Sequence, residues 1–336
     1  MTIDLISTQD EFQALQEEWN ALLEKSASHV PFLRHEYLTS WWSTLGGGEW
    51  DQGDLFILAE RESQGELIGI APFFHHQARI MLLGSHEISD FLDVLAPPEH
   101  LEPFLERIFD YLESDSPHSW QVLDLYNLLA SSPTLPYLKN LAGEKGWTHS
   151  QSRIHPAPHL QLPGSWEAYL NGLESRYRHE IERKLRRAES YFLPVDWHIV
   201  NSEDNLEEEL QDFLELMANH QEKAAFLTET MASQMRSTVR QAHQAGWLQL
   251  AFLTVGDLKA AGYLNFDFNN RIWVYNSGIN PLFENLSPGW VLLAFLIQDA
   301  IQAGRDVLDF MRGDEAYKYH LGGVDRDVVR VEIVRE

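Results

Sequence analysis

Cysteine is absent from this sequence, basic residues are scarce, and long apolar runs are missing. Without cysteine the chain has no disulfides, no thiolate nucleophile and no cysteine-ligated zinc or iron–sulfur site. The 25 Lys and Arg residues stand against 51 Asp and Glu, so the net charge is −26. This charge disfavours duplex DNA and anionic membranes as partners, because both need dense positive charge. No run is long enough to span a bilayer and the first residues do not form a signal peptide, so we expect a cytoplasmic protein.

Several common catalytic motifs are missing as well. The sequence has no G-x-S-x-G elbow, no P-loop and no dinucleotide-binding glycine fingerprint. The 15 histidines do not follow the spacing of a zinc helix. His155 and His159 are four residues apart, but the prolines between them prevent a shared helical face. We therefore expect no metal.

The residues that are present predict a folded α+β protein of two domains. Apolar residues make up 44% of the 336 positions, and this length suits two cores. Pro156, Pro158 and Pro163 mark the boundary, so we expect one domain over 1–155 and a second over 156–336. Apolar periodicity predicts helices at 8–23, 36–45, 101–113, 135–145, 166–191, 204–222, 229–245 and 290–303. It predicts strands at 55–59, 67–74, 79–84, 120–127, 247–255, 259–268, 271–279, 306–311 and 327–334.

Polar residues follow an apolar strand in the segment 306–323. Asp309 interrupts the strand, and Arg312, Asp314, Glu315, Tyr317, Lys318 and His320 come after it. One interpretation is a solvated loop in which Asp309 caps a turn. The other is a polar cluster at the carboxyl end of a buried strand, where sheet-based enzymes place their sites. In that case a carboxylate would act as general base, Tyr317 as hydrogen-bond donor and Lys318 as a stabiliser of negative charge.

Two further segments attract attention. Residues 176–187 contain six Lys and Arg and two Glu, which predicts either a solvated helix face or a site for phosphates or another acidic group. Residues 84–93 alternate small, acidic and aromatic side chains after a strand, which fits either a binding loop or a polar turn. The pair Trp41-Trp42 is more typical of a core than of a ligand platform.

Taken in order, these segments resemble a known family over nearly the whole chain. The matching residues are Pro31-Phe32-Leu33 with Trp41-Trp42, Leu67 to Phe73, Gly84-Ser85 with Ser89 to Asp93, the basic helix 176–187, Tyr275 to Gly278 with Asn280-Pro281, Ser287-Pro288-Gly289, and most specifically Asp309 to Lys318. The sequence is similar to the cellulose-biosynthesis acetyltransferase-like branch of the GNAT superfamily, which is related to the FemABX peptidyltransferases. The resemblance implies tandem GNAT-like domains with mixed, mostly antiparallel sheets flanked by helices, and a substrate groove between the domains.

The resemblance also implies an activity and a set of site residues. We expect an acyltransferase that moves acetyl from acetyl-CoA to an amine or hydroxyl of a sugar or other cell-envelope or exopolysaccharide precursor. The donor phosphates would lie at the helix start formed by Ser287 and Gly289, with Arg176, Arg183 and Lys184 around them. Asp314 or Glu315 would be the base, Tyr317 and Lys318 would support the oxyanion or act as acid, and Asp309 would orient the loop. The acceptor would contact Asp90, Asp93, Tyr275 and Arg312.

Two alternatives remain open at this point. The Gln/Arg-x-x-Gly-x-Gly/Ala loop of ordinary GNAT enzymes is missing before Ser287, so aminoacyl-tRNA is the alternative donor, as in the peptidyltransferases. The net charge of −26 disfavours tRNA unless the basic helix binds it. The second alternative is a catalytically silent protein that uses the double fold to bind a carbohydrate or a partner.

Overall fold

The computed structural model describes residues 2–84, 86–201 and 205–335, and these residues form two compact units. One unit is Met1–Pro156 with Arg326–Glu336, and the other is Ala157–Asp325. The expected boundary after residue 155 lies next to this division. Residues 326–336 differ from the expectation, because they belong to the first unit although we placed them in the second domain.

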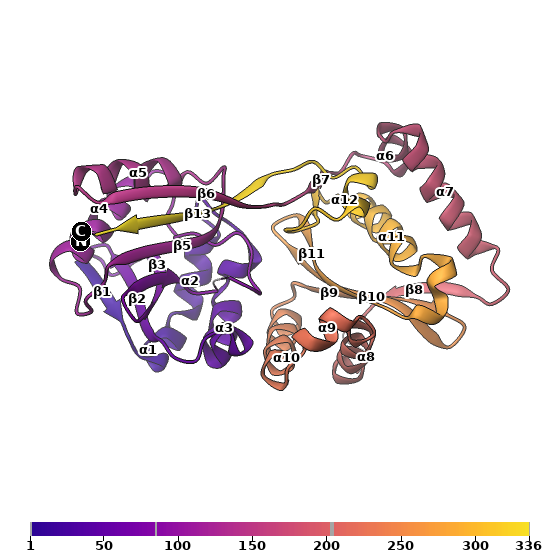
Figure 1. Ribbon diagram of the computed structural model, residues 1–336, viewed down its shortest axis with the longest axis horizontal. Coiled ribbons are helices and arrows are strands. Elements are labelled where there is room, and N and C mark those ends of the chain that lie inside the picture. Colours follow the sequence, from indigo (N-terminus) through magenta and orange to yellow (C-terminus); the bar gives the residue numbers. More distant parts are fainter. Residues whose placement is uncertain (1, 85, 202–204, 336) are drawn as a thin grey trace. The chain divides into compact units, whose positions relative to one another are not determined.

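The first unit is built on a mixed sheet of seven strands. Its strand order is β1 (Thr2–Ile6), β2 (Asp54–Arg61), β3 (Leu67–His76), β4 (Arg79–Leu82), β5 (Val122–Leu129), β13 (Asp327–Val334) and β6 (Thr148–Pro156). β4 and β5 pair in parallel, whereas the other neighbouring strands of this order pair antiparallel. Figure 1 shows two helices on one side of this sheet, α4 (Leu101–Ser114) and α5 (Thr134–Glu144). The other side carries α1 (Gln9–Ala14), α2 (Gln16–Leu23) and α3 (His35–Gly48), with a 3₁₀ turn at Pro31–Leu33 before α3.

Local sequence signals explain where the first helices begin and end. Thr8 and Glu11 form the expected capping box at the start of α1. The expected single helix is broken at Leu15, so α1 and α2 are separate. The triple glycine ends the regular part of α3, because Gly46 and Gly47 have φ of +71° and +70°, which glycine adopts without strain. Trp41 is fully buried and packs on Phe74, as expected of a core residue.

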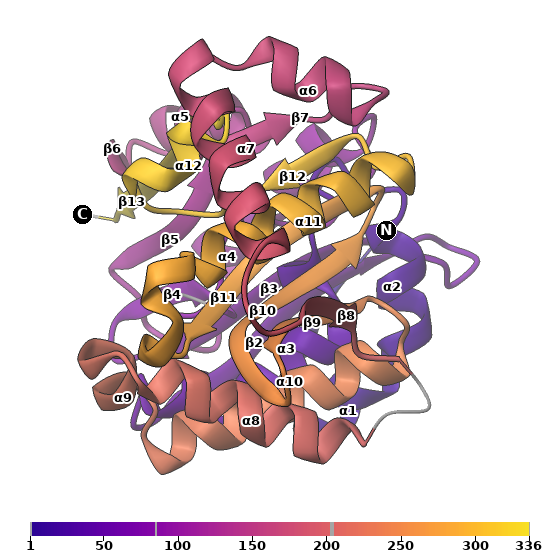
Figure 2. The same cartoon turned by 90° about the vertical axis from the view of Figure 1, so that its right-hand side faces the viewer.

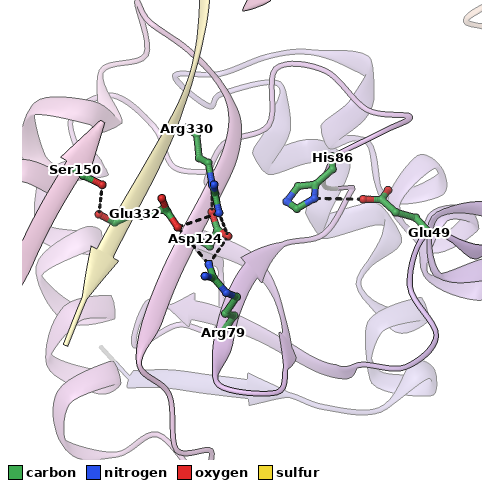
Figure 3. A network of polar contacts seen from close by, with 7 residues as sticks. All are labelled: Glu49, Arg79, His86, Asp124, Ser150, Arg330 and Glu332. Atoms are coloured by element: carbon green, nitrogen blue, oxygen red, sulfur yellow. Dashed lines mark hydrogen bonds and ion pairs between the residues drawn. The ribbon is translucent and has the colours of Figure 1, made fainter. Parts of the chain in front are cut away.

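A buried ion-pair network holds the last strand in the first sheet (Figure 3). Asp124 of β5 is 1% exposed and accepts hydrogen bonds from Arg79 of β4 at 2.8 Å and from Arg330 of β13 at 2.7 Å. Glu332 of β13 lies 2.9 Å from Arg330. A buried carboxylate is stable only when cations and donors surround it, so Asp124 requires both neighbouring strands. The alternating valines of 327–334 predict a strand, but they carry no information about which sheet receives it.

The second unit contains a mixed sheet of six strands. Its order is β7 (His159–Gln161), β12 (Val307–Asp309), β11 (Arg271–Ile279), β10 (Leu258–Phe268), β9 (Leu248–Val255) and β8 (Val195–Ile199). β11 and β12 pair in parallel, whereas the other neighbouring strands of this order pair antiparallel. Figure 2 shows α7 (Ser175–Glu189) and α11 (Pro288–Gln302) on one side of this sheet. On the other side lie α8 (Leu206–Ala218), α9 (Gln221–Phe226) and α10 (Glu229–Gln244).

Short elements complete the second unit and refine the expected helices. The expected helix 166–191 is two helices, α6 (Trp166–Gly172) and α7, which are parted at Leu173 and Glu174. The expected helix 204–222 is two helices, α8 followed by α9. Residue 204, where that helix was expected to begin, and Ser85 of the expected binding loop lie outside the described residues. A 3₁₀ segment, η2 (Pro281–Leu286), precedes α11, and α12 (Ala316–His320) follows β12. The expected apolar helix is α11, which is buried over most of its length. Within the described ranges, no helix has the length and apolar character to cross a membrane.

Candidate functional site

The two parallel strands of the second sheet separate at their carboxyl ends. They pair over three residues, from Arg271 opposite Val307 to Trp273 opposite Asp309. Beyond this point β12 ends, while β11 continues to Ile279 without a β12 partner. The free edge of β11 therefore borders a gap in the sheet.

A β-bulge redirects the side chains of β11 at this gap. Leu264 of β10 pairs with Asn276 and the next residue pairs with Val274, so Tyr275 is the extra residue. After the bulge, Gly278 faces α8: a Cβ at this position would lie 2.6 Å from the backbone of Leu216. Ile279 lies on the opposite side, against the start of α11. The end of β11 is thus enclosed between α8 and α11.

Two adjoining hollows flank this end of β11. The first, which we call the α11 hollow, has a volume of about 370 Å³. It is lined by Lys184, Tyr263, Ser277, Ile279, Glu284, Ser287, Pro288, Gly289, Trp290 and Tyr317. The second, the α9 hollow, has a volume of about 340 Å³ and shares Ser277, Ile279 and Glu284 with the first. It adds Leu216, Met217, Asn219, His220, Lys223, Gly278 and Pro281.

Lys184 supplies the positive charge of the α11 hollow. This residue of α7 is 9% exposed, and its Nζ lies 4.1 Å from the centre of the Trp290 ring and 3.4 Å from Glu180. Burial lowers the pKa of Lys184, whereas Glu180 opposes this shift. A cation so placed, with one carboxylate partner at the rim, is well suited to neutralise a phosphate.

The start of α11 contributes a weaker anion site than the sequence implies. The N–H groups of Trp290 and Val291 donate to the Ser287 carbonyl at 3.0 and 3.1 Å, and Pro288 has no N–H. The structure describes this whole turn, and within it the N–H of Gly289 has no backbone hydrogen-bond partner. The helix dipole still favours negative charge here, but most of the expected free N–H groups are absent.

Two tyrosines line the same hollow, Tyr263, which is buried, and Tyr317, which is partly buried. Burial raises the pKa of Tyr263 well above its ordinary value, and the neighbouring Tyr317 adds to the shift. Burial likewise raises the pKa of Tyr317, with a further contribution from Glu315. Both phenols therefore stay neutral near pH 7 and can donate O–H hydrogen bonds.

Lys223 of α9 is the cation of the α9 hollow. Its Nζ donates to the Ser277 carbonyl at 2.5 Å and to the Asn276 side chain at 2.9 Å, immediately after the bulge. Burial lowers the pKa of Lys223 to about 8, although Glu315 opposes the shift. The lysine thus ties α9 to the part of β11 that lines both hollows.

The structure brings one residue of the expected catalytic loop to the α11 hollow, namely Tyr317. Lys318 is 3% exposed and donates to the loop carbonyls of Met311, Arg312 and Gly313, and it pairs with Glu315 at 2.9 Å. Its ammonium group therefore binds the loop itself.

The carboxylates of the same loop have other surroundings. Asp309 is fully buried, pairs with Arg271 at 3.2 Å and accepts the Met311 N–H at 3.1 Å, so it fixes the turn after β12. Asp314 and Glu315 are exposed, and neither lines a hollow. The role expected of Asp309 and the choice of base both stay predictions.

Of the expected phosphate ligands on α7, only Lys184 lines the hollow. Arg176 pairs with Glu174 at 2.9 Å and its side chain is 69% exposed. Arg183 is exposed. The helix turns its arginines to solvent because its apolar face packs on the core.

The expected acceptor residues are divided between the units. In the first unit, Asp93 is buried and accepts hydrogen bonds from Ser28, Ser132 and Thr134, and burial raises its pKa. Asp90 is also buried there, at 5% exposure. In the second unit, the Tyr275 ring packs on Phe266, and Arg312 is partly exposed in the loop after β12. None of these four residues lines either hollow.

Sequence reasoning missed several residues that line the hollows, among them Tyr263, Ser277, Glu284 and Lys223. Ser277 lies within a motif that carried the family resemblance. The other three have no local signal, because a tyrosine in a strand, a glutamate in a 3₁₀ turn and a single lysine in a helix are common surface patterns.

Comparison with known proteins agrees with this geometry. Residues 175–319 match the family described as Acetyltransferase (GNAT) domain. This stretch contains α7, the separated strands β11 and β12, and α11. The second unit therefore contains the stretch that is similar to a GNAT acetyltransferase domain. No curated protein matches the sequence.

Solved structures extend the likeness to the whole chain. FemX aligns with a TM-score of 0.68 at 12% identity, over 100% of this chain and 98% of its own. L-PGS from Bacillus licheniformis aligns with a TM-score of 0.58 at 11% identity, over 94% of this chain and 90% of its own. A tandem GNAT protein from the clavulanic acid biosynthesis pathway aligns with a TM-score of 0.51 at 11% identity, over 98% of both chains. The chain thus has the tandem GNAT-like, α+β architecture expected from the sequence.

Proposed function

We propose that the protein is an acyltransferase that transfers acetyl from acetyl-CoA to an amine or hydroxyl of a sugar or other cell-envelope precursor. One observation carries the proposal: a buried cation, Lys184, and the start of α11 line a hollow beside the separated end of β11. The hollow also offers apolar surface from Ile279 and Trp290. This combination suits a long ligand with a diphosphate at one end and an apolar arm.

In this proposal the residues around the α11 hollow divide the work. Acetyl-CoA supplies the acetyl group as a thioester. Lys184 and the first turn of α11 bind its diphosphate, and the neutral hydroxyls of Tyr263 and Tyr317 donate hydrogen bonds to negative charge that develops on oxygen and sulfur. Their raised pKa values make them donors rather than acids.

The general base is the remaining requirement. An amine that attacks the acetyl carbon must lose a proton as the new C–N bond forms and the C–S bond breaks. Glu284 is exposed, as Asp314 and Glu315 are, but it is the carboxylate that lines both hollows, so we assign it this role ahead of the other two. The proton passes to Glu284 and CoA leaves as a thiolate, which is held by the tyrosine hydroxyls.

Binding and turnover test this assignment together. We expect saturable binding of acetyl-CoA in calorimetry and transfer of radiolabelled acetyl to members of a panel of amino sugars and hydroxyl acceptors. Glu284→Gln should lower kcat by roughly 100-fold or more, while acetyl-CoA binding is retained. Glu222→Gln, which changes an exposed carboxylate on α9, is the matched control and should stay near wild type. Absence of acetyl-CoA binding would refute the donor, and full activity of Glu284→Gln would move the base to Glu315 or Asp314.

A second candidate is tRNA-dependent aminoacyl transfer of the FemABX type. The observation in its favour is that α11 offers few free N–H groups, while α7 presents exposed arginines. Binding of tRNA that weakens steeply with added salt, together with no binding of acetyl-CoA, would support this function. A silent carbohydrate- or partner-binding protein would bind neither donor.

A further inference from the structure

A second group of chemically active side chains lies in the first unit. Asp54 begins β2, His75 lies near the end of β3, and His118 is in the segment between α4 and β5. The sheet register places Asp54 directly opposite His75, so the two side chains share one face. One possible ligand atom from each of the three residues lies within 4.8 Å of the others.

The hydrogen bonding of His75 leaves one ring nitrogen for a cation. His75 is 8% exposed, and its Nε2 lies 3.3 Å from the carbonyl oxygen of Ser119. A carbonyl only accepts, so Nε2 carries the hydrogen. Among the residues that the structure describes, the buried Nδ1 has no hydrogen-bond partner, and it faces the Asp54 carboxylate at 3.6 Å.

That distance fits a bridging metal ion better than a direct bond. A charge-assisted N–H···O⁻ bond would bring the two atoms to about 2.8 Å. Two ligands of a tetrahedral zinc ion, each about 2.1 Å from the metal, lie about 3.4 Å apart. The Nδ1 atom of His75 and the Asp54 carboxylate thus approach one another as two ligand atoms of one ion would.

His118 supplies the second imidazole from a well-anchored segment. Its ring stacks on that of His75, with centres 4.5 Å apart and planes at 20°. Trp120 donates to a carbonyl of α4 at 2.9 Å and Gln121 donates to Ala78 at 2.8 Å, which holds the segment against the sheet.

We propose that Asp54, His75 and His118 form a binding site for one divalent transition-metal ion, with Zn²⁺ the best match. Two imidazoles and one carboxylate suit zinc in number and chemistry. The Ser119 carbonyl acts as the outer partner that orients His75. The Asp54 side chain is 65% exposed, so the remaining coordination position faces solvent and takes water. The ion joins β2, β3 and the segment before β5, and it therefore stabilises the folded first unit.

Zinc titration of the full chain tests the proposal. After treatment with a chelator and dialysis, calorimetry with ZnCl₂ should give one site per chain, and added Zn²⁺ should raise Tm. His118→Ala and Asp54→Asn, both at sites that are not fully buried, should each weaken binding by roughly tenfold or more. Their Tm values without zinc should stay near that of the wild type, which shows that the variants fold.

A control variant separates this site from ordinary histidine binding. His198→Ala removes a histidine that also faces a carboxylate, with Glu209 at 4.0 Å. Among the described residues, His198 does not belong to a cluster of three possible metal ligands. We expect it to bind zinc as the wild type does. The proposal is overturned if the wild type binds no zinc, if His118→Ala and Asp54→Asn bind it with unchanged affinity, or if His198→Ala alone loses binding.

Discussion

Replacement of Lys184 by methionine is the sharpest test of the α11 hollow as the donor site. Methionine fills the space of the lysine stem but carries no charge. In the structure the Lys184 side chain is 11% exposed and is the cation that lines this hollow. The variant therefore removes the positive charge while keeping the packing against Trp290.

The magnitude follows from the burial of this ammonium group. A hydrogen bond between charged groups contributes about 1.5–3 kcal/mol. The dissociation constant of acetyl-CoA should therefore rise roughly tenfold to 150-fold in Lys184→Met. Loss of the cation above the Trp290 ring costs a further 0.5–1 kcal/mol or so of folding stability, which a small fall in Tm would report.

Calorimetry with acetyl-CoA measures the effect, and Arg183→Met provides the matched control. Arg183 is the preceding residue on the same helix, so its replacement changes net charge equally, but its side chain is exposed to solvent. We expect a change of about twofold or less in the control, because water and salt screen exposed charges. Equal weakening in both variants, or no weakening in Lys184→Met, would show that the buried lysine does not bind the donor.

Three other predictions concern the framework of the two units. Gly278→Ala should lower the free energy of unfolding by about 1–3 kcal/mol in urea titrations, because the new Cβ would lie 2.6 Å from the backbone of Leu216. The control is Gly172→Ala, whose new Cβ would enter open space and should leave the free energy of unfolding unchanged or slightly raised. Asp124→Asn should destabilise by about 2–4 kcal/mol, since it leaves two arginines without their shared buried carboxylate. Burial lowers the folded-state pKa of Lys223 from 10.5 to about 8, so the unfolded chain binds more protons than the folded chain between these pH values. The free energy of unfolding of the wild type should therefore rise with pH in this range, by up to about 1.4 kcal/mol per pH unit. The variant Lys223→Met should lack this rise.

Much of the fold could be predicted from local patterns, because each pattern reflects a local physical cause. The capping box at Thr8 and the apolar face of α11 are set by neighbouring residues, and both elements form as expected. The partner of β13 was not predictable in this way. Its valines specify a strand with a buried face, whereas its place in the first sheet depends on the pairing of Arg330 with Asp124, far away in the sequence.

The candidate site was harder to predict for the same reason. Six basic residues in 176–187 fitted either a solvated helix face or an anion site, and the orientation of α7 buries Lys184 and leaves Arg183 in solvent. Lys318 looked equally suited to chemistry, yet the turn of its loop directs the ammonium group onto loop carbonyls. Long-range packing decides which of several similar side chains reaches a hollow, and sequence spacing does not contain that information.

The charge around the α11 hollow bears on which donor binds there. A diphosphate brings about two negative charges, and the hollow offers one buried ammonium group and the partial positive charge of a helix start, about half a unit. Glu284 lines the same hollow and opposes both. The balance supports moderate affinity for acetyl-CoA, in which the apolar arm contributes through Ile279 and Trp290. In this proposal an anionic ligand binds at one desolvated cation, although the chain as a whole carries −26. That net charge disfavours polyanions such as tRNA, whereas the exposed arginines of α7 favour them.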